Sequence, residues 1–245
     1  MKPHLKQVFA TLMLLFIAAP AAQAQVDLSS SVFFGSPYVW RGEVLSSGWV
    51  FQPAITVSYS GLSATIFGNI DPNSMWANDN VHLQEADVTL AYGTSLSNVA
   101  LSAGYTFYNF PTPVDDEVQL LNTQEFFVSA GLTSGPVQPS IFVAYDFDEN
   151  VQNSLKGVYA EAKVGVPFSV GGHEYGLGAA LGLDGGYLLP GDETRLSHLA
   201  LTASTAFEAG SISISPLAGF QASLADVYKE SFGDTFFYGG LTVGF

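Results

Sequence analysis

The chain has 245 residues, no cysteine and a formal net charge of −15, and its 12% of charged residues is about half the usual share of a soluble domain. The acidic balance excludes nucleic acid as a partner, and the lack of cysteine excludes disulfides and thiolate metal sites. So few charges indicate that something other than water covers part of the surface.

The first 24 residues are typical of a cleaved secretory signal. Lys2 and Lys6 give a positive start, residues 8–19 form an apolar run, and Ala22-Gln23-Ala24 is a small-residue cleavage site. The apolar run is shorter than the roughly 20 residues that a membrane helix needs. We therefore expect a cleaved signal at 1–24 and a barrel at 25–245, which keeps five basic and 22 acidic residues and a net charge of −17.

Beyond the signal, the sequence alternates apolar side chains with small or polar ones, which is the period of a β-strand. The alternation is clearest over 99–108, where Leu101 and Tyr105 share one face and Ser102 and Thr106 the other. No long stretch shows the period of an amphipathic helix. The pattern predicts strands at 26–36, 49–59, 62–71, 83–95, 98–109, 123–133, 137–148, 155–167, 173–184, 196–208, 212–224 and 235–245.

The connections between these strands alternate in length. Tight links at 60–61, 96–97, 134–136, 170–172 and 209–211 carry mostly Gly, Ser or Pro, and longer links fall between them. An even number of strands with short turns at one end and long loops at the other is the layout of bacterial outer-membrane barrels. The sequence therefore predicts an all-β fold: a transmembrane, antiparallel, up-and-down β-barrel of about twelve strands in the outer membrane, with both chain ends on the periplasmic side.

A soluble secreted β-sandwich or barrel also produces short alternating strands, and it is the main alternative fold. In a barrel that spans a membrane, the closed sheet pairs every backbone polar group internally and its apolar face meets lipid. A soluble barrel has the opposite arrangement, with the aliphatic and aromatic side chains inside. The low charge content and the regular alternation of loop lengths favour the membrane barrel.

The strand expected at 235–245 puts Phe237, Leu241, Val243 and Phe245 on one face. This strand resembles the C-terminal signal of proteins that the outer-membrane assembly machinery inserts, in which a terminal Phe closes an alternating strand. The resemblance implies that Phe245 is an assembly signal and that this machinery is a partner of the protein.

A second resemblance lies near the start of the expected barrel. The stretch Ser36-Pro37-Tyr38-Val39-Trp40-Arg41-Gly42, followed by Gln52-Pro53-Ala54 and Gly68-Asn69-Ile70-Asp71, is similar to the opening of the TorF-type porin family of Gram-negative bacteria, which carries a Tyr-Val-aromatic-Arg-Gly signature. The similarity covers only the first strands, and it departs from the family at Pro37 and at 43–45. It implies an outer-membrane porin.

The strand parity also assigns ionisable side chains to the interior of the barrel. Acids outnumber bases there, so the lumen is expected to be net negative and to favour cations and neutral solutes. Glu161 and Lys163 also fit a purely structural role, as ion-pair partners that help to fill the barrel. The expected pore-lining residues are Arg41, Glu85, Asp87, Glu125, Asp146, Asp148, Glu161, Lys163, Glu174 and Asp184.

Aromatic residues are expected in two places. Those that face lipid near the barrel ends form interfacial belts, and we assign to them Tyr38, Trp40, Tyr59, Tyr92, Tyr105, Phe107, Tyr145 and Phe147. Others face inward, where they either plug the barrel or offer ring faces to a solute such as a sugar or nucleoside. This inward set is Phe33, Phe67, Tyr108, Phe127, Phe142, Tyr159 and Tyr238.

These features favour a porin or small-solute channel whose partners are outer-membrane lipids and small hydrophilic solutes. One alternative is a closed structural or adhesion barrel whose loops bind outside partners. Another is a lipid hydrolase at the outer rim, with His82 and Ser74 or His198 and Ser197 as its candidate residues. Because isolated rim histidines are poor evidence for catalysis, we expect no enzyme, no catalytic residue, no cofactor and no dedicated metal site. The sequence leaves the oligomeric state open.

Overall fold

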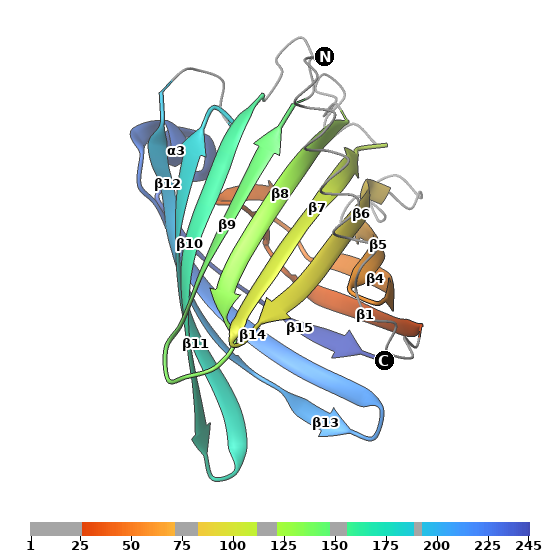
Figure 1. Ribbon diagram of the computed structural model, residues 1–245. Coiled ribbons are helices and arrows are strands. Elements are labelled where there is room, and N and C mark those ends of the chain that lie inside the picture. The colour runs from red at the N-terminus through yellow and green to blue at the C-terminus, as the bar shows by residue number, and fades with distance from the viewer. Residues whose placement is uncertain (1–25, 72–82, 112–121, 148–155, 189–192) are drawn as a thin grey trace, which may run out of the picture.

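The structure is a computed structural model, and its described residues form a closed β-barrel (Figure 1). The expected signal at 1–24 lies outside the described part of the chain, as do Asp148, Ser74 and His82. The described residues are 26–71, 83–111, 122–147, 156–188 and 193–245.

Each barrel strand pairs antiparallel with the next one along the chain, and the pairing of β1 with β15 closes the sheet. The segments β12 and β13 pair with successive parts of β14, so together they form the tenth of twelve barrel strands. The bounds are β1 Asp27–Ser36, β4 Val50–Tyr59, β5 Leu62–Ile70, β6 Leu83–Leu96, β7 Val99–Asn109, β8 Thr123–Leu132, β9 Gln138–Asp146, β10 Gly157–Val170, β11 His173–Gly185, β12 Arg195–Thr205, β13 Phe207–Ala209, β14 Ile212–Ser223 and β15 Thr235–Gly244.

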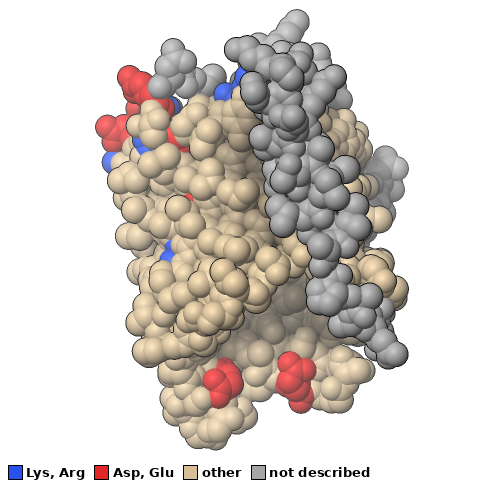
Figure 2. All heavy atoms as spheres, in the orientation of Figure 1, with Lys and Arg blue, Asp and Glu red and all other residues tan. Residues whose placement is uncertain are grey.

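The predicted all-β barrel is confirmed, and its two faces are those of a membrane protein. Large apolar side chains such as Leu28, Ile66 and Phe237 are exposed on the outside, whereas polar ones such as Asn69 and Gln221 are buried inside. Figure 2 agrees, because on the face shown Asp and Glu gather at the two ends and the band between them is dominated by uncharged residues. A soluble barrel has these faces exchanged, so the soluble alternative is rejected.

The tight turns and the C-terminus lie at one end of the barrel, and α3 (Asp226–Phe232) lies at the other (Figure 1). The largest difference from the predicted bounds is in β10, which was expected to end at Pro167 and instead reaches Val170. Pro167 is tolerated because β9 pairs with β10 only as far as Gly165, so beyond that point only β11 lies alongside.

Two connections that the sequence left as loops contain secondary structure. β2 (Tyr38–Trp40) and β3 (Glu43–Ser46) form a small hairpin between β1 and β4, and α3 lies between β14 and β15. Among the described residues, no helix combines the length and the apolar character needed to cross a membrane. The β2–β3 hairpin lies inside the barrel, where it contacts the inner wall.

Candidate functional site

The β2–β3 hairpin folds into the barrel and contacts its inner wall. Its turn consists of Arg41 and Gly42, both with positive φ (51° and 95°). The Gln221 side-chain Nε2 on β14 donates to the Gly42 carbonyl oxygen at 2.8 Å. A Cβ atom on Gly42 would lie 2.6 Å from Nδ1 of His198, so glycine is needed both for the backbone angle and for the close approach.

Arg41 anchors the hairpin to β8. Its Nη1 and Nη2 donate to the two carboxylate oxygens of Glu125 at 2.7 and 2.8 Å, and the side chains of Arg41 and Glu125 are only 9% and 1% exposed. A buried ion pair needs further hydrogen bonds to offset the loss of hydration, and Glu125 accepts them from the hydroxyls of Tyr108 and Tyr187. Each carboxylate oxygen of Glu125 therefore accepts two hydrogen bonds, one from Arg41 and one from a tyrosine hydroxyl.

Aromatic rings surround the guanidinium group of Arg41. Its central carbon lies 4.6 Å from the ring centroids of Trp40 and Tyr187, 4.9 Å from that of Tyr159 and 5.1 Å from that of Phe142. Such cation–π contacts are stronger where water is excluded. Phe142 and Tyr159 were predicted to face inward, and here they hold the hairpin rather than a free solute.

Tyr38 and Trp40 are not belt residues, and this part of the prediction was wrong. Extending the parity of β1 placed them toward lipid, but β1 ends at Ser36, before Pro37, and the chain turns inward. The Trp40 ring lies 5.4 Å from that of Tyr108, and Tyr38 lies 6.5 Å from Phe67, both on the inner wall. The predicted inward direction of Arg41 agrees with the structure, although a hairpin and not a strand carries it.

Further side chains fill the half of the lumen at the long-loop end, where the β2–β3 hairpin lies. We call this half the outer half and the half near the short turns the inner half. The backbone N–H groups of Tyr187 and Leu188 donate to Oδ1 of Asp184 at 2.7 and 3.0 Å, which turns this segment inward after β11. Tyr187 and Leu188 join a buried cluster with Tyr228 of α3. The hairpin, the segment after β11 and α3 thus narrow the long-loop end of the barrel together.

Beneath the hairpin lies a cavity of about 660 Å³. Its lining reaches from the Trp40–Gly42 turn to Gln138, near the short turns. Glu161 projects into it, with one carboxylate oxygen 2.6 Å from Nζ of Lys163 and the other 3.4 Å from Nε2 of His198. The inner half of the lumen is therefore open space with nearly balanced charges.

The structure also places the remaining predicted pore-lining residues. Glu85, Asp87, Asp146 and Asp184 are buried on the inner wall in the outer half, as is Glu125. Glu174 instead lies exposed on the part of the β10–β11 hairpin that extends beyond β9, where it hydrogen-bonds Ser169.

Arg195 and Tyr187 are among the interior residues that the sequence analysis missed. Arg195 was assigned to a loop, but it begins β12 opposite Asp184 and adds a base at the outer end. Tyr187 was also left in a loop, although it bonds Glu125. The glycines at 185 and 186, which break β11 just after Asp184, were the signal that the chain changes direction there.

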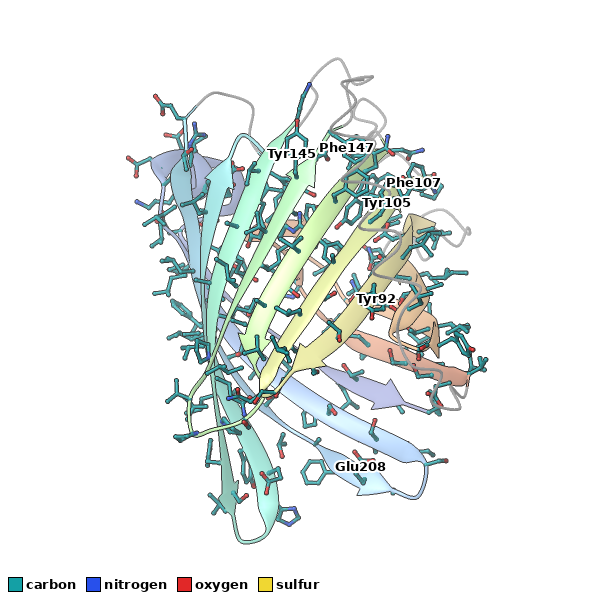
Figure 3. The ribbon with its side chains drawn as sticks, in the orientation of Figure 1. Tyr92, Tyr105, Phe107, Tyr145, Phe147 and Glu208 are labelled. Carbon is teal, nitrogen blue, oxygen red and sulfur yellow. The ribbon has the colours of Figure 1, made fainter. Side chains whose placement is uncertain are left out.

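The outward aromatic residues lie toward the ends of the wall. Phe126 stacks on Phe147 with ring centroids 4.9 Å apart, and Tyr59 is exposed where β4 meets its short turn. These positions suit a lipid interface, and the belt itself stays a prediction. Figure 3 shows Tyr105, Phe107, Tyr145 and Phe147 near the long-loop end, Tyr92 lower on the wall and Glu208 at the short-turn end.

The hydrolase alternative has one cluster among the described residues. The Ser197 hydroxyl lies 3.0 Å from Nδ1 of His198, and Glu161 lies on the other side of the imidazole ring. Ser197 is 0% exposed and does not line the cavity, so it offers no accessible nucleophile. No group of three or more His, Cys, Asp or Glu side chains in the described part of the chain is arranged to hold a metal ion.

A closed twelve-stranded barrel with an apolar exterior and an inward hairpin has the fold of bacterial outer-membrane porins. No family profile and no curated protein matches the sequence. Among solved structures, the NanC porin matches with a TM-score of 0.50 and 10% identity, over 89% of this chain and 98% of that one. An outer membrane channel from Pseudomonas putida F1 matches with a TM-score of 0.49 and 11% identity, over 93% of this chain and 98% of that one. The likeness to NanC supports the fold, and membership of the TorF-type family stays a prediction.

Proposed function

We propose that the protein is a channel of the bacterial outer membrane that passes small hydrophilic cations and neutral solutes. The observation that carries this proposal is the sign of the charge on the inner wall. Six of the predicted acids in the described residues face the interior, against the bases Arg41, Lys163 and Arg195. A ring of carboxylates at a constriction favours cations. The six acids are Glu85, Asp87, Glu125, Asp146, Glu161 and Asp184.

In the outer half of the proposed path the hairpin lies inside the barrel and packs against Glu125. This packing also favours the second candidate, a closed barrel that does not conduct and acts through its outer loops. The two candidates differ in one measurable property. The wild-type protein conducts in a planar bilayer if it is a channel, whereas a closed structural barrel remains silent even though it folds.

Ion preference is tested by the reversal potential across a salt gradient, with EDTA present to remove divalent ions. The wild-type protein should prefer cations, and the preference should weaken as salt rises, because the Debye length is about 10 Å at 0.1 M. Changing Glu85, Asp87 and Glu161 together to their amides should move the reversal potential toward zero. The matched control is Asp226→Asn on α3, an exposed acid that already pairs with Lys229. A preference for anions, or no change in the triple variant, would contradict the proposal.

A further inference from the structure

Glu85 and Asp87 form a buried pair of carboxyl groups on the inner face of β6. The residues are two apart and so share one face of the strand, and they are only 2% and 7% exposed. In the barrel register Glu85 lies opposite Asn69 of β5, and Asp87 lies between Phe67 of β5 and Tyr108 of β7. None of the described residues directly opposite the pair in this register carries a formal charge.

Two oxygen atoms distinguish this pair from an ordinary acidic patch. Oε2 of Glu85 and Oδ1 of Asp87 are fully buried and have no hydrogen-bond partner among the described residues. Each carboxyl group also has a hydrogen-bond donor: Tyr38 of the hairpin donates to Glu85, and the backbone N–H of Asn109 donates to Asp87. A buried polar atom without a partner in a folded protein calls for an ion or a water at that point.

The base on the hairpin does not neutralise this pair. Both terminal nitrogens of Arg41 are engaged by Glu125, and that carboxylate adds its own negative charge to the same wall. Two buried carboxylates without a counter-charge are strongly unfavourable. Either a proton or a cation must supply the missing positive charge.

A single shared proton does not neutralise the pair. The two carboxyl groups interact directly with each other, and one proton between them removes only one of their two negative charges. The pair would still carry one negative charge in a buried site. A cation that contacts the unpartnered oxygens supplies the missing charge, and two negative charges match a divalent ion.

We propose that Glu85 and Asp87 bind a hard divalent cation of the Mg²⁺ or Ca²⁺ type. The groups at the site are carboxylates and a phenol, so the side-chain ligand atoms are oxygens, which suit these hard ions better than zinc, whose usual sites include His nitrogen or Cys sulfur. Two carboxylates with water in the remaining positions is a usual way of holding Mg²⁺. Because Tyr38 bonds Glu85, the ion also braces the hairpin against β6.

Terbium luminescence tests the site directly in the full-length protein refolded in detergent. Tb³⁺ substitutes for Ca²⁺ and emits when nearby phenol rings transfer energy to it, and Tyr38 and Tyr108 lie beside the pair. We expect sensitised emission that Mg²⁺ and Ca²⁺ displace. Glu85→Gln and Asp87→Asn should each weaken Tb³⁺ binding at least tenfold, and Glu208→Gln at the exposed short-turn end should not (Figure 3).

Thermal unfolding gives a second measurement that does not depend on terbium. Mg²⁺ should raise the melting temperature of the wild-type barrel relative to EDTA, and Asp87→Asn should remove this response while leaving the barrel heat-modifiable on gels. Emission that survives both amide substitutions places the ion elsewhere, and a melting temperature that follows pH but not Mg²⁺ identifies a shared proton. Either result overturns the proposal. Neither measurement involves conduction, so failure here is separate from failure of the channel.

Discussion

The two halves of the lumen hold the same kind of ion pair in different surroundings. In the outer half, Arg41 and Glu125 meet through two hydrogen bonds and are almost fully buried. In the inner half, Nζ of Lys163 lies 2.6 Å from one carboxylate oxygen of Glu161, and the Lys163 side chain is 53% exposed. Both pairs join opposite charges, so the difference between them is burial. The comparison indicates that a buried pair stabilises the fold, whereas a solvated pair mainly sets the local charge of the lumen.

The physical reason lies in hydration. Removing one partner of a buried pair leaves an uncompensated charge in a medium that solvates it poorly, whereas a solvated partner is simply rehydrated. The planar guanidinium of Arg41 also matches both oxygens of a carboxylate at once, which a lysine ammonium cannot do. We therefore expect the two halves to respond very differently to equivalent substitutions.

The largest effect is expected from Arg41→Ala. Breaking a buried pair costs about 3–5 kcal/mol, and the loss should appear in the free energy of unfolding measured by urea titration in detergent. The ring centroid of Trp40 lies 4.6 Å from the guanidinium carbon of Arg41, so the fluorescence of Trp40 should change when the hairpin is released. Changing Trp49 and Trp76 to Phe leaves Trp40 as the one tryptophan that reports this release. Single-channel conductance should rise at the same time.

Arg41→Lys is the matched control, because it keeps the charge and loses the two-pronged geometry. It should lie between the wild type and Arg41→Ala in stability and in conductance. If Arg41→Ala unfolds as the wild type does and the fluorescence of Trp40 is unchanged, the pair does not hold the hairpin.

A smaller effect is expected from Tyr187→Phe, which removes one hydrogen bond to Glu125 and keeps the ring beside Arg41. Hydrogen bonds to charged groups are worth about 1.5–3 kcal/mol, so unfolding should become easier by that amount. Tyr145→Phe is the control, since its phenol lies on the outer face of the barrel. Equal losses in both variants would show that the Tyr187 hydroxyl has no special part in the outer half.

The difference between the halves also separates what the sequence could predict from what it could not. Strands and their inward faces were predictable, because alternation and turn residues are local signals, and the parity placed Glu125 and Glu161 correctly. The hairpin was not predictable in this way. Arg41 and Glu125 are 84 residues apart, and nothing local to either residue specifies that contact.

A partial signal for the hairpin was nevertheless present. Pro37 ends the pairing of β1, and an Arg-Gly step follows four residues later, which together suit a strand end and a tight turn. The parity argument continued across Pro37 and so directed Tyr38 and Trp40 to lipid. The error in Arg195 is of another kind, a strand boundary misplaced by one residue.

The smallest effect is expected from Lys163→Ala in the inner half. Lys163 is half-exposed and is rehydrated when its partner is lost, and pairs of this kind contribute at most about 1 kcal/mol, so the free energy of unfolding should change little. The lumen, however, loses a positive charge and keeps Glu161, so the reversal potential should shift toward stronger cation preference. Glu161→Gln is the opposite test, because it leaves Lys163 without its partner and should shift the preference toward anions. If Lys163→Ala destabilises the barrel as much as Arg41→Ala does, the inner pair is structural, and the distinction between the two halves fails.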